Sequence, residues 1–179
     1  MKKKILLMAI ALMSIGITNT VMAQATATQS ANASAKIITP IDISKDADMS
    51  FGNIGIDGTV GTVILAASAD GSRTEGGGAF LPATTGTVAA AEFTVSGENS
   101  YTYTITIPTG THTITHTNAT DVMTVSNFTS SPDTNAGNGE LSAAGSQTVY
   151  VGATLNLVAS QQAGTYTSLT GFNVVVNYN

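Results

Sequence analysis

The two histidines, His112 and His116, are the side chains best suited to bind a metal or move a proton at neutral pH. They stand four residues apart in an alternating segment, so a strand would place them on one face about 13 Å from each other. That separation is too large for two ligands of one zinc ion, and the chain has no cysteine to add to them. A serine hydrolase of the nucleophile-turn type is also disfavoured, because no G-x-S-x-G stretch occurs. We therefore predict no catalytic residue, no metal site and no cofactor, and expect a protein that is not an enzyme.

Three other stretches have chemically suggestive residues, and a structural role explains each more simply. Gly76–Gly78 is not followed by Lys-Ser or Lys-Thr, so it is interpreted as a flexible loop rather than a phosphate loop. The segment Asp133–Glu140 has several oxygen donors but lacks the spacing of an EF-hand, which favours a plain turn and leaves weak calcium binding open. Phe93, Tyr101 and Tyr103 could form a sugar-binding face, although core packing is the preferred interpretation.

The first residues have the anatomy of a secretory leader. Lys2–Lys4 form a basic start, an apolar run follows, and Val21-Met22-Ala23 ends in the small-residue pattern of a signal-peptidase site. The apolar run is shorter than the roughly 20 residues that a membrane span needs. We predict a signal peptide over 1–23, an exported protein, and no membrane span after cleavage.

The charge of the remaining chain narrows its partners. Beyond residue 23 only three basic residues, Lys36, Lys45 and Arg73, stand against eleven acidic ones, which gives a net charge of −8. Nucleic-acid binding depends on neutralising phosphates with Lys and Arg, so we expect no nucleic-acid partner. Without any cysteine, the exported chain must be held together by burial and hydrogen bonds alone.

Alternating apolar and polar residues, interrupted by Gly, Pro, Asn and Asp, predict short strands along the whole chain. The expected strands cover 31–44, 49–51, 62–67, 90–97, 101–108, 111–117, 121–130, 147–159 and 172–179. The short gap between 90–97 and 101–108 predicts a hairpin, and Gly152 allows a bulge in 147–159. No helical period is evident.

Eight or nine short, mostly antiparallel strands in one domain are typical of an all-β, immunoglobulin-like sandwich. We expect this sandwich over 36–179, preceded by an extension rich in Ala, Thr and Ser over 24–35. The final strand has its apolar residues in period two, which places four side chains on one face. These are Phe172, Val174, Val176 and Tyr178. Val175 is the one apolar residue on the opposite face.

Several stretches together resemble a bacterial family, the domain of unknown function 4402. They are "ANASAKIITPIDISKDADMSFGNI", "AAEFTVSGENSYTYTITIP", "TVYVGATLNLVASQQAGTYT" and the terminal "FNVVVNYN". The turn "AGTY" with a final alternating strand is also similar to spore-coat-U-type domains and to pilins of archaic chaperone–usher systems. Such pilins often carry a disulfide, which this chain lacks.

The resemblance implies an exported surface protein that assembles by β-strand addition, with the row Phe172, Val174, Val176 and Tyr178 as the assembly strand. Its implied partners are other copies of itself in a fibre, or a periplasmic chaperone and outer-membrane assembly machinery. Residues 24–35 could pair with their own domain or with a neighbour. The alternative function is a monomeric surface or secreted module that binds a glycan or a protein.

Overall fold

The computed structural model describes residues 25–132 and 139–179, and the predicted leader and most of Asp133–Glu140 lie outside these ranges. The described residues contain strands and no helix, so the all-β prediction is confirmed. The strands are β1 (Asp42–Ala47), β2 (Ser50–Phe51), β3 (Gly55–Leu65), β4 (Arg73–Phe80), β5 (Val88–Ala89), β6 (Ala91–Ser96), β7 (Thr102–Thr106), β8 (His112–His116), β9 (Val122–Ser131), β10 (Gly139–Glu140), β11 (Ser146–Leu157), β12 (Tyr166–Thr167) and β13 (Val175–Tyr178).

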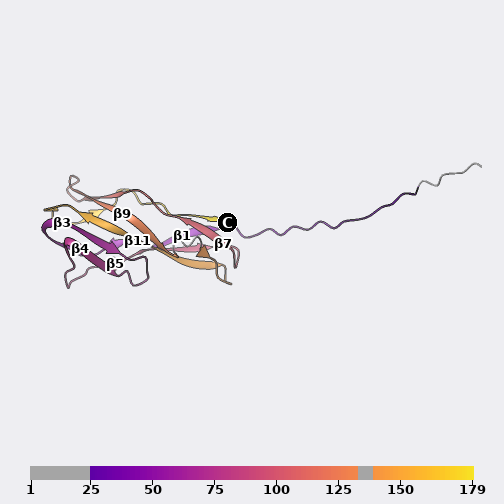
Figure 1. The fold of residues 1–179 in the computed structure, drawn as a ribbon, viewed down its shortest axis with the longest axis horizontal. Coiled ribbons are helices and arrows are strands. Elements are labelled where there is room, and N and C mark those ends of the chain that lie inside the picture. The colour runs from indigo at the N-terminus through magenta and orange to yellow at the C-terminus, as the bar shows by residue number, and fades with distance from the viewer. Residues whose placement is uncertain (1–24, 133–138) are drawn as a thin grey trace, which may run out of the picture. The chain divides into compact units, whose positions relative to one another are not determined.

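The long strand β11 organises the larger sheet (Figure 1). Its first half pairs with β6, which in turn pairs with β1, and its second half pairs with β3, which pairs with β4. On the opposite edge β11 pairs with β9, followed by β8 and β12. The register between β11 and β9 shifts between Gly152 and Thr154, but the extra residue lies in β9, between Ser126 and Thr129, and not in β11 as predicted. A Cβ at position 152 would collide with main-chain atoms of the segment that follows β3, so this crossing requires glycine.

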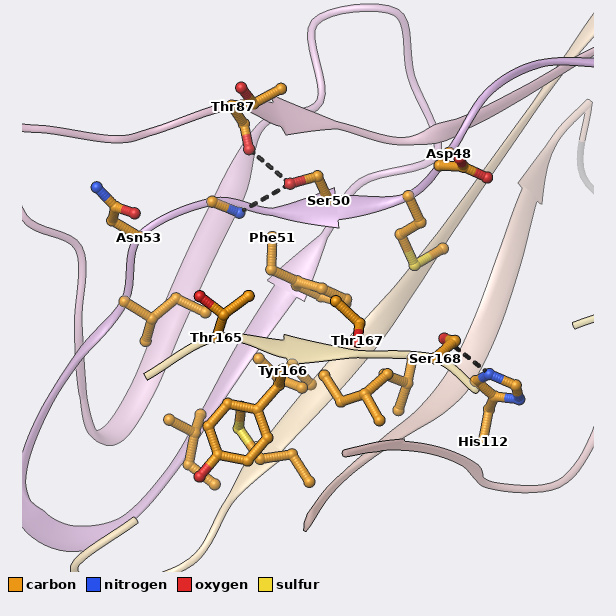
Figure 2. Close-up of a pocket in the computed structure, with 18 of the residues that line it drawn as sticks. Asp48, Ser50, Phe51, Asn53, Thr87, His112, Thr165, Tyr166, Thr167 and Ser168 are labelled. Carbon is orange, nitrogen blue, oxygen red and sulfur yellow. Dashed lines mark hydrogen bonds between the residues drawn. The ribbon is translucent and has the colours of Figure 1, made fainter. Parts of the chain in front are cut away.

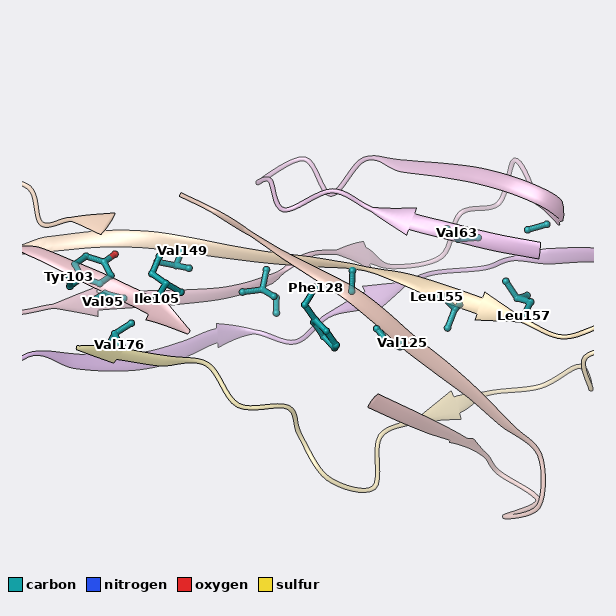
Figure 3. Packing of buried hydrophobic residues seen from close by; sticks show 14 of the residues in the cluster. Val63, Val95, Tyr103, Ile105, Val125, Phe128, Val149, Leu155, Leu157 and Val176 are labelled. Atoms are coloured by element: carbon teal, nitrogen blue, oxygen red, sulfur yellow. The ribbon is translucent and has the colours of Figure 1, made fainter. Parts of the chain in front are cut away.

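A smaller sheet, β10-β7-β13, supplies the second layer, and β2 and β5 form a separate pair. Alternating side chains from both layers fill the core, as the strand pattern predicts. Figure 3 shows Tyr103, Ile105 and Val176 from the small sheet gathered with Val95 and Val149 toward one end of this core. The two-layer arrangement is consistent with the predicted sandwich.

The hairpin predicted from 90–97 and 101–108 is wrong. β6 pairs with β1 and β11 in the large sheet, whereas β7 pairs with β10 and β13 in the small one. The turn between them carries the chain from one layer to the other. At its start, Gly97 N–H donates to Gly145 O beside β11 (2.9 Å), and at its end Tyr101 O accepts from Leu141 N–H beside β7 (2.9 Å). Each strand therefore finds partners far away in the sequence, which local spacing does not reveal.

The prediction of a flexible loop at Gly76–Gly78 is also wrong. These residues lie in β4, which pairs with the edge of β3 that faces away from β11. Glycine usually weakens a strand, but here two backbones approach closely. Gly77 lies opposite Gly61 and has a φ of 64°, and a Cβ on it would collide with the Val60 carbonyl oxygen. The glycines therefore permit the pairing instead of interrupting it.

The first strand begins later than the sequence indicates. Pairing starts at Asp42, so the strand predicted over 31–44 is wrong for most of its length. Residues 25–36 are exposed and belong to no strand, and they fall in a unit, 1–36, that is distinct from 37–179. Ile37 has 95% of its surface exposed, because no neighbouring strand covers it. The alternation before Asp42 thus forms no strand in the described chain.

Candidate functional site

The four apolar residues of the C-terminal segment do share one face, and that face points into the core. Val176 is 8% exposed, and the other three are partly buried against the same cluster. The Phe172 ring packs on Phe128 with centroids 5.0 Å apart. Main-chain pairing covers only Val175–Tyr178, so the predicted strand over 172–179 is shorter than expected, although the inward alternation begins at Phe172.

Tyr178 fastens the end of this strand to the start of the domain. Its hydroxyl donates to Thr39 O (2.8 Å) and accepts from Glu98 N–H (2.6 Å). Its ring meets Tyr101 edge-on with centroids 5.6 Å apart. These contacts explain why a strand so close to the last residue is held in place, since termini without such neighbours usually fray.

One edge of β13 pairs with no other strand among the described residues. Asn179 N–H donates to Thr102 O of β7 (3.3 Å). In an antiparallel pair, residues that hydrogen-bond to the partner strand alternate with residues whose main-chain groups point away from it. The main-chain N–H and C=O groups of Val175 and Asn177 therefore point toward β7, while those of Val176 and Tyr178 point away from it. No other described strand pairs with this edge, although β1 lies beside it in the other layer.

The open edges differ in charge. Natural proteins protect exposed edges with charged side chains, and β1 has Asp42, Lys45 and Asp46 among its six residues. β4 likewise carries Arg73 and Glu75. β13 carries no charged side chain, and its outward residue Val175 is 47% exposed. Of these three edges, β13 is the one without charge protection.

The two histidines form hydrogen bonds with residues of the neighbouring loops and not with each other. His112 Nε2 lies 3.0 Å from Ser168 Oγ, and its ring meets Phe172 edge-on at 6.0 Å. His116 Nδ1 accepts from Asn118 N–H (3.0 Å), which leaves Nε2 to donate to Ala163 O (3.1 Å). Over the ranges that the structure covers, no cluster of three metal-ligating side chains occurs.

The aromatic residues considered for a sugar-binding face are distributed between core and surface. Tyr103 is fully buried, Phe93 packs against the core, and Tyr101 is 38% exposed. The Tyr103 hydroxyl donates to Gln147 Oε1 (2.7 Å), and burial raises the pKa of this phenol to about 12. The three rings do not form a common exposed platform, so the core interpretation describes Tyr103 and Phe93.

A cleft of about 1160 Å³ lies between the segment 48–56 and the segment 161–168 (Figure 2). Its apolar lining includes Met49, Phe51 and Ile114. Sequence reasoning missed this feature, because its walls come from distant segments. The only local signal was the alternation of Met49 with Phe51 and of Ile54 with Ile56, which a buried core explains equally well.

The family model for a domain of unknown function, DUF4402, matches residues 41–178. No curated protein matches the chain, and no solved structure does so. The similarity to pilins therefore stays a prediction. No helix long and apolar enough to cross a membrane is found in the described part of the chain.

Proposed function

The chain belongs to the DUF4402 family, and from this premise we propose that it is a non-enzymatic, exported structural subunit that assembles at the cell surface by strand addition. The observation that carries the proposal is the uncharged open edge of β13. In strand addition, main-chain hydrogen bonds to such an edge supply affinity. Fimbria-like assembly and a contribution to cell adhesion are the roles that fit a subunit of this kind.

The row Phe172, Val174, Val176 and Tyr178 takes part indirectly in this proposal. Its side chains are packed against the subunit's own core, so they hold β13 against β7 and leave the pairing of its other edge to the main chain. The incoming strand pairs with the outward main-chain groups of Val176 and Tyr178. Val175, half exposed beside them, gives it an apolar contact.

The incoming strand comes from another copy of the chain in a fibre, or from a periplasmic chaperone that delivers the subunit to outer-membrane machinery. The leader over 1–23 supports export, and the acidic chain beyond it argues against nucleic acid as a partner. Residues 25–36, which are exposed and belong to no strand, are a candidate source of such a strand. Their small side chains would bury little area, so most of their affinity would come from the main chain.

The test is Val175→Asp, which adds a charge beside the open edge without touching the core. We expect the wild type to form a ladder of high-mass species on gels run without full denaturation, and the variant to remain monomeric with an unchanged melting temperature. Negative-stain microscopy of cells with and without the chain adds a second readout.

Val122→Asp is the matched control. Val122 is 48% exposed, almost the same as Val175, but it lies on β9, which has partners on both sides. This variant should polymerise as the wild type does. Persistence of the ladder in Val175→Asp, or a wild type that stays monomeric at every concentration, would contradict strand addition at this edge.

A second function, a monomeric binding module, is favoured by one observation, the cleft between 48–56 and 161–168. The two functions are compatible, because the cleft and the β13 edge use different surfaces of the domain.

A further inference from the structure

The cleft lies over the half of the large sheet that the small sheet does not cover. β7 and β13 place Tyr103, Ile105 and Val176 over one end of the core (Figure 3). Toward the other end, Leu155 and Leu157 of β11 line the floor of the cleft instead. The cleft is therefore a concave opening above that end of the core, and the two leucines beneath it are buried.

Flexible and aromatic side chains form much of the apolar wall. Met49 and Phe51 come from the β2 side, Ile114 from β8, Met123 from β9, and Phe172 from the C-terminal segment. All five pack against the core and are only partly buried. Methionine adapts its shape to irregular apolar partners, and a concave apolar surface with a few polar groups is typical of small-molecule sites.

The polar groups around the opening are neutral or already paired. The charged side chains in the lining are Lys45 and Asp48, which form an ion pair with each other, and the histidine of the lining, His112, is hydrogen-bonded to Ser168. The remaining polar residues offer hydroxyls and amides, such as Ser168 and Gln161. No buried polar side-chain atom among the described residues lacks a hydrogen-bond partner. No unpaired charge in the lining can thus balance a charged ligand.

We propose that this cleft binds an uncharged molecule with a long hydrocarbon part. The hydrocarbon displaces water from the partly exposed apolar wall around Met49, Phe51 and Ile114, and a neutral hydroxyl or amide head remains at the opening. Burial of apolar surface supplies the affinity. A charged head is disfavoured, because a charge removed from water needs a partner that the lining does not offer.

Thr167→Trp tests the site by filling it. Figure 2 shows Thr167 projecting from β12 toward the side of the cleft that carries Phe51. Thr113→Trp is the matched control, since Thr113 is an exposed threonine on the neighbouring strand β8 and does not line the cleft. The chain has no native Trp, so both variants carry a single one. Melting temperatures establish that both variants are folded.

The probe is the neutral fluorophore N-phenyl-1-naphthylamine. We expect saturable binding to the wild type and to Thr113→Trp, and binding weakened about tenfold or more in Thr167→Trp. Displacement by 1-dodecanol should need about tenfold less competitor than displacement by dodecanoate or dodecyltrimethylammonium.

Failure of the wild type to bind the probe, or equal binding by both Trp variants, would overturn the site. Equal displacement by the charged competitors would overturn the ligand class. Tighter displacement by an extended peptide with alternating apolar residues would assign the cleft to a protein partner instead. None of these results depends on polymerisation, so they are independent of the test at Val175.

Discussion

Val176→Asp is the sharpest test of how the C-terminal strand is oriented. Val176 is 8% exposed and belongs to the core cluster, whereas the neighbouring Asn177 is exposed. Asn177→Asp therefore adds the same side chain one residue away, on the opposite face. A shift of one residue in register would exchange the two outcomes.

The magnitude follows from burial. Removing a buried valine costs about 1.5–3 kcal/mol, and burying a carboxyl group in its place costs about 1–3 kcal/mol more. Together these consume a large part of the roughly 5–15 kcal/mol that keeps a domain folded. For a domain of this size the melting temperature should fall by about 10 °C or more. Asn177→Asp should change the free energy of unfolding by less than about 0.5 kcal/mol.

Thermal melts and urea titrations of monomeric protein at pH 7 measure both variants. The deficit of Val176→Asp should narrow at acidic pH, because burial raises the folded-state pKa of the new carboxyl and its neutral form is less costly to bury. Equal losses of melting temperature in the two variants would refute the one-sided strand, and with it the argument that the apolar row is committed to the core.

Two further predictions concern a buried phenol and the leader. Because burial raises the pKa of Tyr103 from 10.0 to about 12, its stabilisation of the fold should be complete below pH 10 and lost as the pH rises toward 12. Tyr103→Phe should remove this alkaline loss of stability, and at pH 7 it should cost about 1 kcal/mol for the lost hydrogen bond to Gln147. If the urea midpoints of the wild type and the variant run parallel across pH 9–12, the prediction for Tyr103 is contradicted. Export should cleave the chain after Ala23, so mass spectrometry should find a mature N-terminus at Gln24, and a chain that retains Lys2–Lys4 would contradict the leader.

The strand content of the fold was predictable because period-two alternation is a local signal. β8, β9 and β11 begin and end within about two residues of the expected positions. Partners were not predictable in the same way. β6 follows the pattern of a hairpin strand, but its partners Asp42–Ala47 and Ser146–Val151 lie about fifty residues away on either side. Pairing of that kind depends on tertiary contacts that sequence spacing does not encode.

Two elements were predicted wrongly for the same reason, because local composition does not show which segments become neighbours. Gly76–Gly78 has the composition of a loop, yet close approach to β3 makes it a strand. Residues 31–41 have the alternation of a strand, yet they form none in the described chain. In the candidate site, the inward face of Phe172 to Tyr178 followed from alternation alone, whereas the open edge of β13 and the cleft required knowledge of which strands are neighbours.

The hydrogen bond from Tyr178 to Thr39 joins residues 139 positions apart and brings the two ends of the domain together. A pulling force applied at these ends would act first on that contact and then on the outermost pairs of β1 and β13. Since Asp42 and Tyr178 are the first and last paired residues of those strands, their hydrogen bonds would open one after another, like a zipper, instead of sharing the force in shear. An isolated subunit should therefore be mechanically weak at its ends. A neighbouring strand bound along β13 would give the force an additional path and strengthen the subunit where it is weakest.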